Sequence, residues 1–134
     1  MGVEIYPEFN PPVRGLIYEA EGKAIADNVD RIEAFSKKRK IRPVTDFLDN
    51  RDMPDDVDDN EEWSATRTDW YPAAEGLHAV QSLAQAIRSD PKAAERWNME
   101  DPDGLETLLS DLDDLARCLG VAATRGAKFR LGVG

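Results

Sequence analysis

The longest regular pattern of apolar residues lies near the C-terminus, between Asp101 and Gly126. Its apolar positions alternate at spacings of three and four, which places them along one face of an α-helix. These positions are Leu105, Leu108, Leu112, Leu115, Leu119 and Ala122. Asp101 and Pro102 are of the residue types that begin helices, and Gly126 is of the type that ends them. The pattern predicts a long amphipathic helix that forms one wall of the core.

Two further stretches carry apolar residues at helical spacing. One runs from about residue 22 to residue 39. The other begins at Pro72 and ends before Pro91, because a residue that precedes proline is disfavoured in a helix. The first apolar face consists of Ile25, Val29, Ile32 and Phe35, and the second of Leu77, Val80, Leu83, Ala84 and Ile87. The chain is therefore expected to contain three amphipathic helices.

Both ends of the chain alternate between apolar and polar residues, which is the pattern of a β-strand. Pro7 places the N-terminal strand at a sheet edge or a bulge, because proline has no N–H group to donate. The residues expected to face the helices are Val3, Ile5, Phe129, Leu131 and Val133. Each strand needs a partner, so we expect the two to pair with each other. The predicted fold class is α+β, with three amphipathic helices packed on a small sheet that includes the N- and C-terminal strands.

The length and composition favour one intracellular domain. A chain of 134 residues fits a single domain, which we expect to span residues 1–134. The sequence shows no apolar run of about 20 residues and no export signal at its start. Cys118 is the single cysteine, so the fold has no internal disulfide. We therefore expect a cytoplasmic protein that does not insert into membranes.

The net charge of −10 is concentrated in one segment. Residues 46–62 hold nine acidic residues against one arginine, which leaves −8 there, while the remainder is close to neutral. We call this stretch the acidic segment and expect it to form an exposed loop. Its charge disfavours nucleic acid as a partner, because phosphate binding depends on Lys and Arg. A basic protein is the partner that the charge favours.

Motifs for catalysis are absent from the sequence. It contains no phosphate-binding glycine loop, no paired cysteines for zinc and no serine in a nucleophile elbow. His78 is the only histidine, and a structural or surface role is favoured over catalysis. Cys118 lies beside Arg117, but a nucleophilic role would require His78 to reach it from another helix. We expect no catalytic residue and no cofactor.

The acidic segment partly matches a calcium-binding loop. Asp56, Asp58 and Asn60 have the spacing at which such a loop begins. The match then fails, because Glu61 stands where the turn needs glycine and Arg67 stands where the loop needs its last carboxylate. A solvated acidic loop is the favoured interpretation, and no metal site is predicted.

Three aromatic residues, Trp63, Trp70 and Tyr71, follow the acidic segment. Large aromatic side chains beside charges are common at protein interfaces, although more often such residues cover a core. The hypothetical binding site combines the aromatic residues with acidic neighbours. It consists of Asp55, Asp56, Asp58, Asp59, Glu61, Glu62, Trp63, Trp70 and Tyr71.

The sequence resembles a group of small, uncharacterised acidic bacterial proteins. The likeness lies in Tyr6-Pro7-Glu8-Phe9, in Trp70-Tyr71-Pro72-Ala73-Ala74-Glu75-Gly76-Leu77, in Asp111-Leu112-Asp113-Asp114-Leu115 and in Gly126-Ala127-Lys128-Phe129-Arg130-Leu131. It concerns helix starts and strand ends rather than catalytic residues. The resemblance implies a bacterial origin and a shared domain, and it assigns no functional residues.

Several functions remain open at this point. The favoured one is a non-enzymatic binding module, regulatory or immunity-like, whose acidic segment and flanking tryptophans dock on a basic protein. The alternative is a metal-dependent hydrolase that uses acidic residues, with Glu75 or Asp69 near Tyr71 as candidates. A purely structural domain is the third reading. A homodimer through an exposed face of the long helix is also left open.

Overall fold

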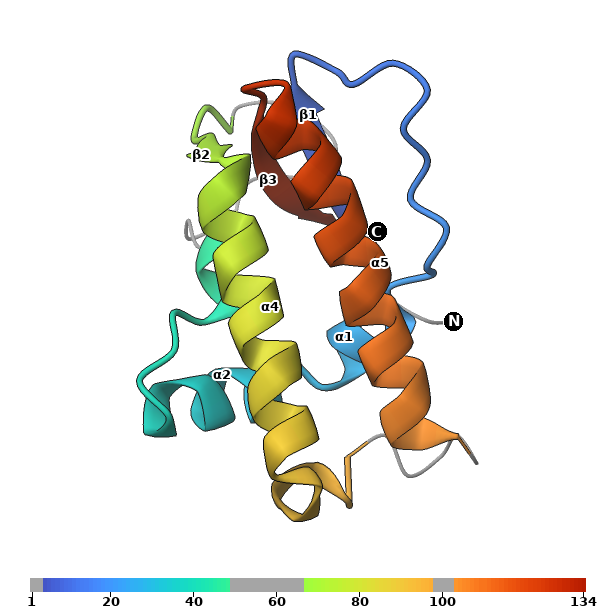
Figure 1. Ribbon diagram of the computed structural model, residues 1–134, viewed down its shortest axis with the longest axis vertical. Coiled ribbons are helices and arrows are strands. Elements are labelled where there is room, and N and C mark those ends of the chain that lie inside the picture. The colour runs from blue at the N-terminus through green and yellow to red at the C-terminus, as the bar shows by residue number, and fades with distance from the viewer. Residues whose placement is uncertain (1–3, 49–66, 98–102) are drawn as a thin grey trace, which may run out of the picture.

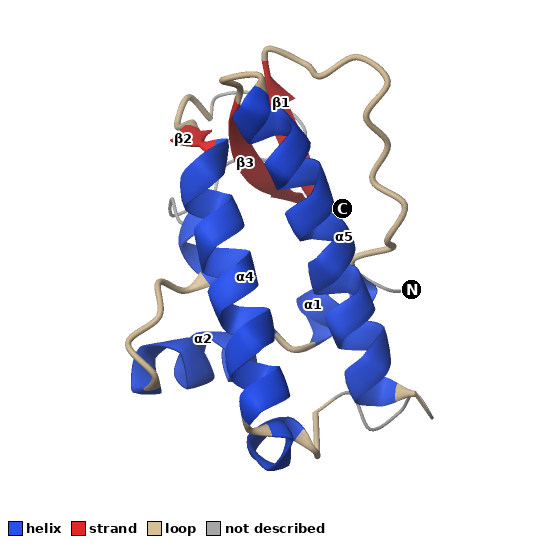
Figure 2. Cartoon of the chain, in the orientation of Figure 1, coloured by secondary structure: helices blue, strands red, loops and turns tan. Residues whose placement is uncertain are grey.

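The computed structural model describes residues 4–48, 67–97 and 103–134 (Figure 1). In chain order the elements are strand β1 (Ile5–Asn10), helices α1 (Lys23–Asp27) and α2 (Val29–Lys38), the 3₁₀ helix η1 (Val44–Phe47), strand β2 (Tyr71–Pro72), helix α4 (Ala73–Ser89), the 3₁₀ helix η2 (Pro91–Ala94), helix α5 (Gly104–Thr124) and strand β3 (Lys128–Val133). Helices and strands are both present and pack together (Figure 2). The predicted α+β class is confirmed.

The three strands form one antiparallel sheet in the order β1-β3-β2. The strands from the two ends of the chain pair as predicted, with Ile5 opposite Val133 and Asn10 opposite Lys128. The short strand β2 lies along the other side of β3, with Tyr71 opposite Phe129. Strands β1 and β2 are both edge strands, which is where their prolines can be accommodated.

Helices α4 and α5 run side by side in opposite directions and pack on one face of the sheet (Figure 1). We call this face the inner face and the opposite one the outer face. The predicted apolar face of α5 is buried from Leu108 to Ala122, whereas Leu105 is only partly buried. The inner face contributes Ile5, Phe129 and Leu131 to the same core. The core therefore lies between the two long helices and the inner face.

Val133 does not face the core as predicted, because 56% of its surface is exposed. Its cross-strand neighbour Ile5 is buried in the core, and the backbone of Gly22 lies directly against the Ile5 backbone. Val133 is the last residue of β3, where the strand is exposed. The alternating pattern predicted the strand correctly, but it did not predict that the last residue of the strand would be exposed.

The helix predicted from residue 22 to residue 39 is divided into α1 and α2 at Asn28. The side-chain amide of Asn28 donates to the carbonyl oxygen of Ala24 at 2.7 Å, and its backbone N–H donates to that of Ile25. Its own carbonyl then accepts the N–H of Ile32 and begins α2. Asn28 thus ends one helix and begins the next, because its short polar side chain competes for backbone hydrogen bonds. The predicted apolar residues Ile25, Ile32 and Phe35 are nevertheless buried.

The ends of α5 differ in how well they match the sequence pattern. The helix begins at Gly104, with Asp103 at the N-cap position. Asp101 and Pro102, which were expected to begin it, lie outside the described residues. At the other end, Gly126 adopts a φ of 66°, as predicted for a residue that closes a helix.

Candidate functional site

The buried side chain of Arg67 connects three parts of the fold. Only 4% of this side chain is exposed. Its guanidinium group donates to the carbonyl oxygen of Leu131 on β3 at 2.8 Å and to that of Phe47 at the end of η1 at 2.7 Å. It also forms two hydrogen bonds with the carboxylate of Asp69, at 2.7 and 3.1 Å. Every nitrogen of the guanidinium group therefore has a partner, which is what a buried arginine requires.

Arg67 and Phe47 lie on either side of residues 49–66, which contain all but the first acidic residue of the acidic segment. Residues 49–66 are outside the described structure, and Arg67 is the first residue after them. Because the guanidinium group of Arg67 binds the Phe47 carbonyl oxygen and that of Leu131, Phe47 and Arg67 are held at one place beside β3. We call Phe47, Arg67 and Asp69 the anchor.

Tyr71 belongs to the aromatic part of the core next to the anchor. Its ring lies 5.1 Å from that of Phe47, and the Phe47 ring lies 4.8 Å from that of Phe129. The guanidinium group of Arg42 lies 4.5 Å from the Phe47 ring centre. The Tyr71 hydroxyl donates to Asp69 at 3.1 Å. Burial and this hydrogen bond raise the pKa of Tyr71, whereas the hydrogen bonds from Arg67 hold the pKa of Asp69 below its usual value.

Trp70 lies on the outer face of the sheet, on the opposite side from Tyr71. The guanidinium group of Arg130 lies 4.2 Å from its ring centre. Arg130 also binds the carboxylate of Glu8 at 3.2 Å and donates to the backbone oxygen of Arg67 at 2.8 Å. Glu8 and Arg130 are opposite each other in the strand register. Glu8, Arg130 and Trp70 therefore form one row across the outer face, which we call the outer row.

Tyr6 extends the outer row toward the end of β3. It lies opposite Gly132, and 38% of its surface is exposed. A Cβ atom at Gly132 would lie 2.7 Å from the Tyr6 ring, so the ring can lie flat here only because the residue is glycine. The outer face thus presents Tyr6 and the half-buried Trp70, with the Glu8 carboxylate and the mostly buried Arg130 side chain, which is 14% exposed, between them.

The predicted binding residues divide between described and undescribed parts of the chain. Trp70 and Tyr71 are described, and they lie on opposite faces of the sheet rather than together. The remaining predicted residues, Asp55, Asp56, Asp58, Asp59, Glu61, Glu62 and Trp63, lie outside the described residues. The sequence pattern missed Arg67 and Arg130. Arg130 lies between the buried residues Phe129 and Leu131 in a strand pattern, so the alternation could have placed it on the outer face. Nothing in the sequence marked Arg67 as buried.

The carboxylates considered for a hydrolase are each bound to an arginine. Glu75 accepts a hydrogen bond from Arg42 at 2.8 Å, and Asp69 is held by Arg67. His78 is exposed on α4. Burial raises the pKa of the Cys118 thiol, which disfavours its thiolate form. Across residues 4–48, 67–97 and 103–134, no three His, Cys, Asp or Glu side chains gather as a metal-binding set.

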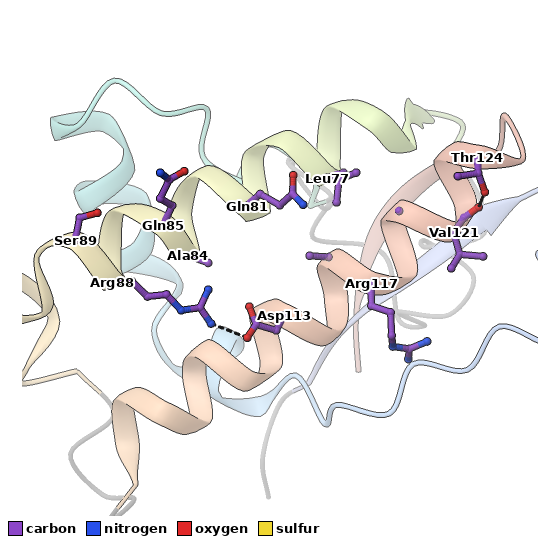
Figure 3. Close-up of a pocket in the computed structure, with 12 residues that line it drawn as sticks. Leu77, Gln81, Ala84, Gln85, Arg88, Ser89, Asp113, Arg117, Val121 and Thr124 are labelled. Carbon is purple, nitrogen blue, oxygen red and sulfur yellow. Dashed lines mark hydrogen bonds and ion pairs between the residues drawn. The ribbon is translucent and has the colours of Figure 1, made fainter.

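A groove of about 960 Å³ lies between α4 and α5 (Figure 3). Small residues on its walls include Ala84, Ala116 and Gly120. Arg88 on α4 and Asp113 on α5 form an ion pair of 2.6 Å across it (Figure 3). These two charges neutralise each other, so the groove has the character of a surface between packed helices rather than a reactive centre.

Comparison of the chain with protein-family models, curated proteins and solved structures found no match. The resemblance to small acidic bacterial proteins therefore stays a prediction. Among the helices that the structure describes, none is long and apolar enough to cross a membrane.

Proposed function

We propose that this protein is a non-enzymatic cytoplasmic binding module that docks on a basic protein. The outer row and Tyr6 form the contact surface, and the charge of the acidic segment attracts the partner. The observation that carries the proposal is the outer row, because it places Trp70 and Arg130 on a sheet face opposite the one that α4 and α5 cover.

The composition of this surface supports the proposal. Trp, Tyr and Arg dominate the binding energy of protein interfaces, because they bury a large area at a small entropic cost. The half-buried Trp70 is held by Arg130, so little freedom is lost when a partner covers it. The anchor holds Phe47 and Arg67, on the two sides of residues 49–66, next to the sheet, and the Arg67 backbone oxygen binds Arg130 of the outer row. The charge of −8 in the acidic segment would accelerate encounter with a basic surface.

A photocrosslinking experiment in the source cells tests where a partner binds. A photoreactive phenylalanine analogue replaces Tyr6 on the outer face, and a matched variant carries it at Gln85 in the groove between α4 and α5. We expect a basic protein to be crosslinked from position 6 and not from position 85. Crosslinking from position 85 alone would contradict the proposed surface.

Affinity measurements with the crosslinked protein then test the roles of Trp70 and of charge. Trp70→Ala is expected to weaken binding at least tenfold, which corresponds to about 1.4 kcal/mol. Neutralising the acidic segment should weaken binding and reduce its salt dependence. That variant carries Asp55→Asn, Asp56→Asn, Asp58→Asn, Asp59→Asn, Glu61→Gln and Glu62→Gln. Its control neutralises the exposed Asp27 and Asp30 instead.

An affinity that stays the same between low and high salt would overturn the proposal. So would equal binding by the neutralised variant and the wild-type chain. The metal-dependent hydrolase gains no support from the fold, because Asp69 and Glu75 are both occupied by arginines.

A further inference from the structure

The segment between β1 and α1, residues 11–22, is held to α5 at a few points. We call this segment the strap; it contains no helix or strand and passes alongside α5 (Figure 1). The backbone N–H groups of Glu19 and Ala20 both donate to one carboxylate oxygen of Asp114, at 2.8 and 2.9 Å. Arg117 donates to the carbonyl oxygen of Ile17 at 2.6 Å. Two side chains of α5 therefore hold three residues of the strap, Ile17, Glu19 and Ala20.

Asp114 and Arg117 also bind each other. The Arg117 Nε atom donates to the second carboxylate oxygen of Asp114 at 2.9 Å, so both oxygens of this carboxylate are occupied. Burial acts to raise the pKa of Asp114, but the N–H groups of Ala20 and Glu19 and the Arg117 guanidinium outweigh it and lower the pKa. Asp114 is thus ionised at neutral pH, and the strap N–H groups bind a charged acceptor.

The closed strap covers Cys118. This thiol is fully buried and donates to the Ile17 carbonyl oxygen at 3.7 Å, the same oxygen that Arg117 binds. Val13 and Tyr18 of the strap are partly buried against the core, whereas Ile17 leaves 66% of its surface exposed. The buried hydroxyl of Tyr18 has no hydrogen-bond partner among the described residues. Closure therefore combines this partial apolar burial with the hydrogen bonds to Asp114 and Arg117.

We propose that the strap is a latch: Asp114 holds it closed, and it opens without unfolding of the core to expose the Cys118 thiol. Local opening of this kind is expected where a segment has no helix or strand of its own, contributes only partly buried residues to the core and is held by a small number of hydrogen bonds. The α4 and α5 contacts with the sheet do not involve the strap, so they persist when it opens.

The rate at which Cys118 reacts with a disulfide reagent such as dithiobis(nitrobenzoate) tests this proposal. The chain has one cysteine, so labelling of the full-length protein reports on this position alone. The test variant is Asp114→Asn, which keeps the shape of the side chain and removes its charge. The control is Asp113→Asn, which removes the neighbouring carboxylate and its ion pair with Arg88 in the groove. We expect Asp114→Asn to be labelled at least tenfold faster and Asp113→Asn to be labelled at the wild-type rate.

The dependence of labelling on urea distinguishes the latch from global unfolding in the wild-type chain itself. Opening of a short segment exposes little surface, so the labelling rate should rise less steeply with urea than the unfolding equilibrium measured by circular dichroism. Equal slopes for the two would overturn the proposal, whether or not Asp114→Asn folds. Equal labelling of the Asp113 and Asp114 variants would also overturn it.

Discussion

The guanidinium group of Arg67 donates to the carbonyl oxygen of Phe47 across 2.7 Å, and these two residues lie on either side of residues 49–66, which hold most of the acidic segment. An arginine that is buried to this extent usually serves the fold, because its burial is tolerated only when every N–H group finds an acceptor. Here the acceptors come from η1, from β3 and from Asp69. The fold thus holds Phe47 and Arg67, on the two sides of residues 49–66, at one place.

Arg67→Lys is expected to destabilise the protein by about 1–3 kcal/mol, because one ammonium group cannot reach three separate acceptors and leaves buried oxygens unpaired. Urea unfolding at neutral pH measures the loss. Arg88→Lys is the matched control, since Arg88 forms an exposed ion pair and its replacement should cost at most about 1 kcal/mol. Equal losses in the two variants would show that Arg67 is not held as described.

Leu112→Ala is expected to cost roughly 2–5 kcal/mol, because Leu112 is fully buried in the middle of α5 and its truncation leaves a cavity. Leu109→Ala on the same helix should cost less, since Leu109 is only partly buried. Thermal and urea unfolding of both variants compare them directly. An unchanged midpoint for Leu112→Ala would contradict the assignment of this helix face to the core.

Two glycines on the long helices should respond to alanine in opposite directions. At Gly76 a Cβ atom would lie 2.2 Å from the Phe129 ring, so Gly76→Ala must displace the ring and destabilise the protein by about 1–3 kcal/mol. At Gly120 the nearest atom would be 4.0 Å away, so Gly120→Ala should stabilise α5 by about 0.5–1 kcal/mol. Unfolding midpoints measure both changes. Stabilisation by Gly76→Ala would be inconsistent with this packing.

Asp111→Asn is expected to stabilise the protein at neutral pH. Burial raises the pKa of Asp111, and Glu21 and Asp114 raise it further, against the opposing effect of the Ala24 N–H group. The folded protein therefore holds this proton at a higher pH than the unfolded chain, so the favourable contribution of Asp111 is full in acid and is lost as pH rises through the folded pKa. Asparagine stays neutral, so its advantage should be present at pH 7 and absent below about pH 4. Unfolding curves across this range provide the check, and a variant less stable than wild type at pH 7 would refute it.

The parts of the fold that the sequence predicted are those with a long, regular apolar pattern. Leu108 to Ala122 repeat over many turns, and Phe129 and Leu131 alternate in a strand, so burial along these elements follows directly from their spacing. Asn28 divided a predicted helix because its side-chain amide binds the Ala24 carbonyl oxygen at the end of α1 while its backbone carbonyl begins α2, and the apolar spacing across it gives no sign of the break. The break between the two helices is therefore determined by local hydrogen bonds and not by the spacing of the apolar residues.

The candidate site was harder to predict from the sequence than the fold was. Trp70 and Tyr71 were grouped because they are adjacent, but neighbouring residues of an extended chain point to opposite faces of a sheet. To predict that they lie on opposite faces, one would have to know that β2 exists. This strand has only two residues and leaves almost no pattern in the sequence. Arg67 could not be identified, since its acceptors come from positions 20 and 64 residues away in the chain.

The pairing of β1 with β3 also determines the order in which the molecule can be assembled. Glu8 and Arg130 meet across 122 sequence positions, whereas α4 and α5 follow each other closely. A strand cannot pair with a partner that has not yet been synthesised, so β1 waits for β3 while the residues between them are made. Ile5 is without its neighbour in β3 throughout this interval, and the sheet closes only after the sequences of α4 and α5 are present.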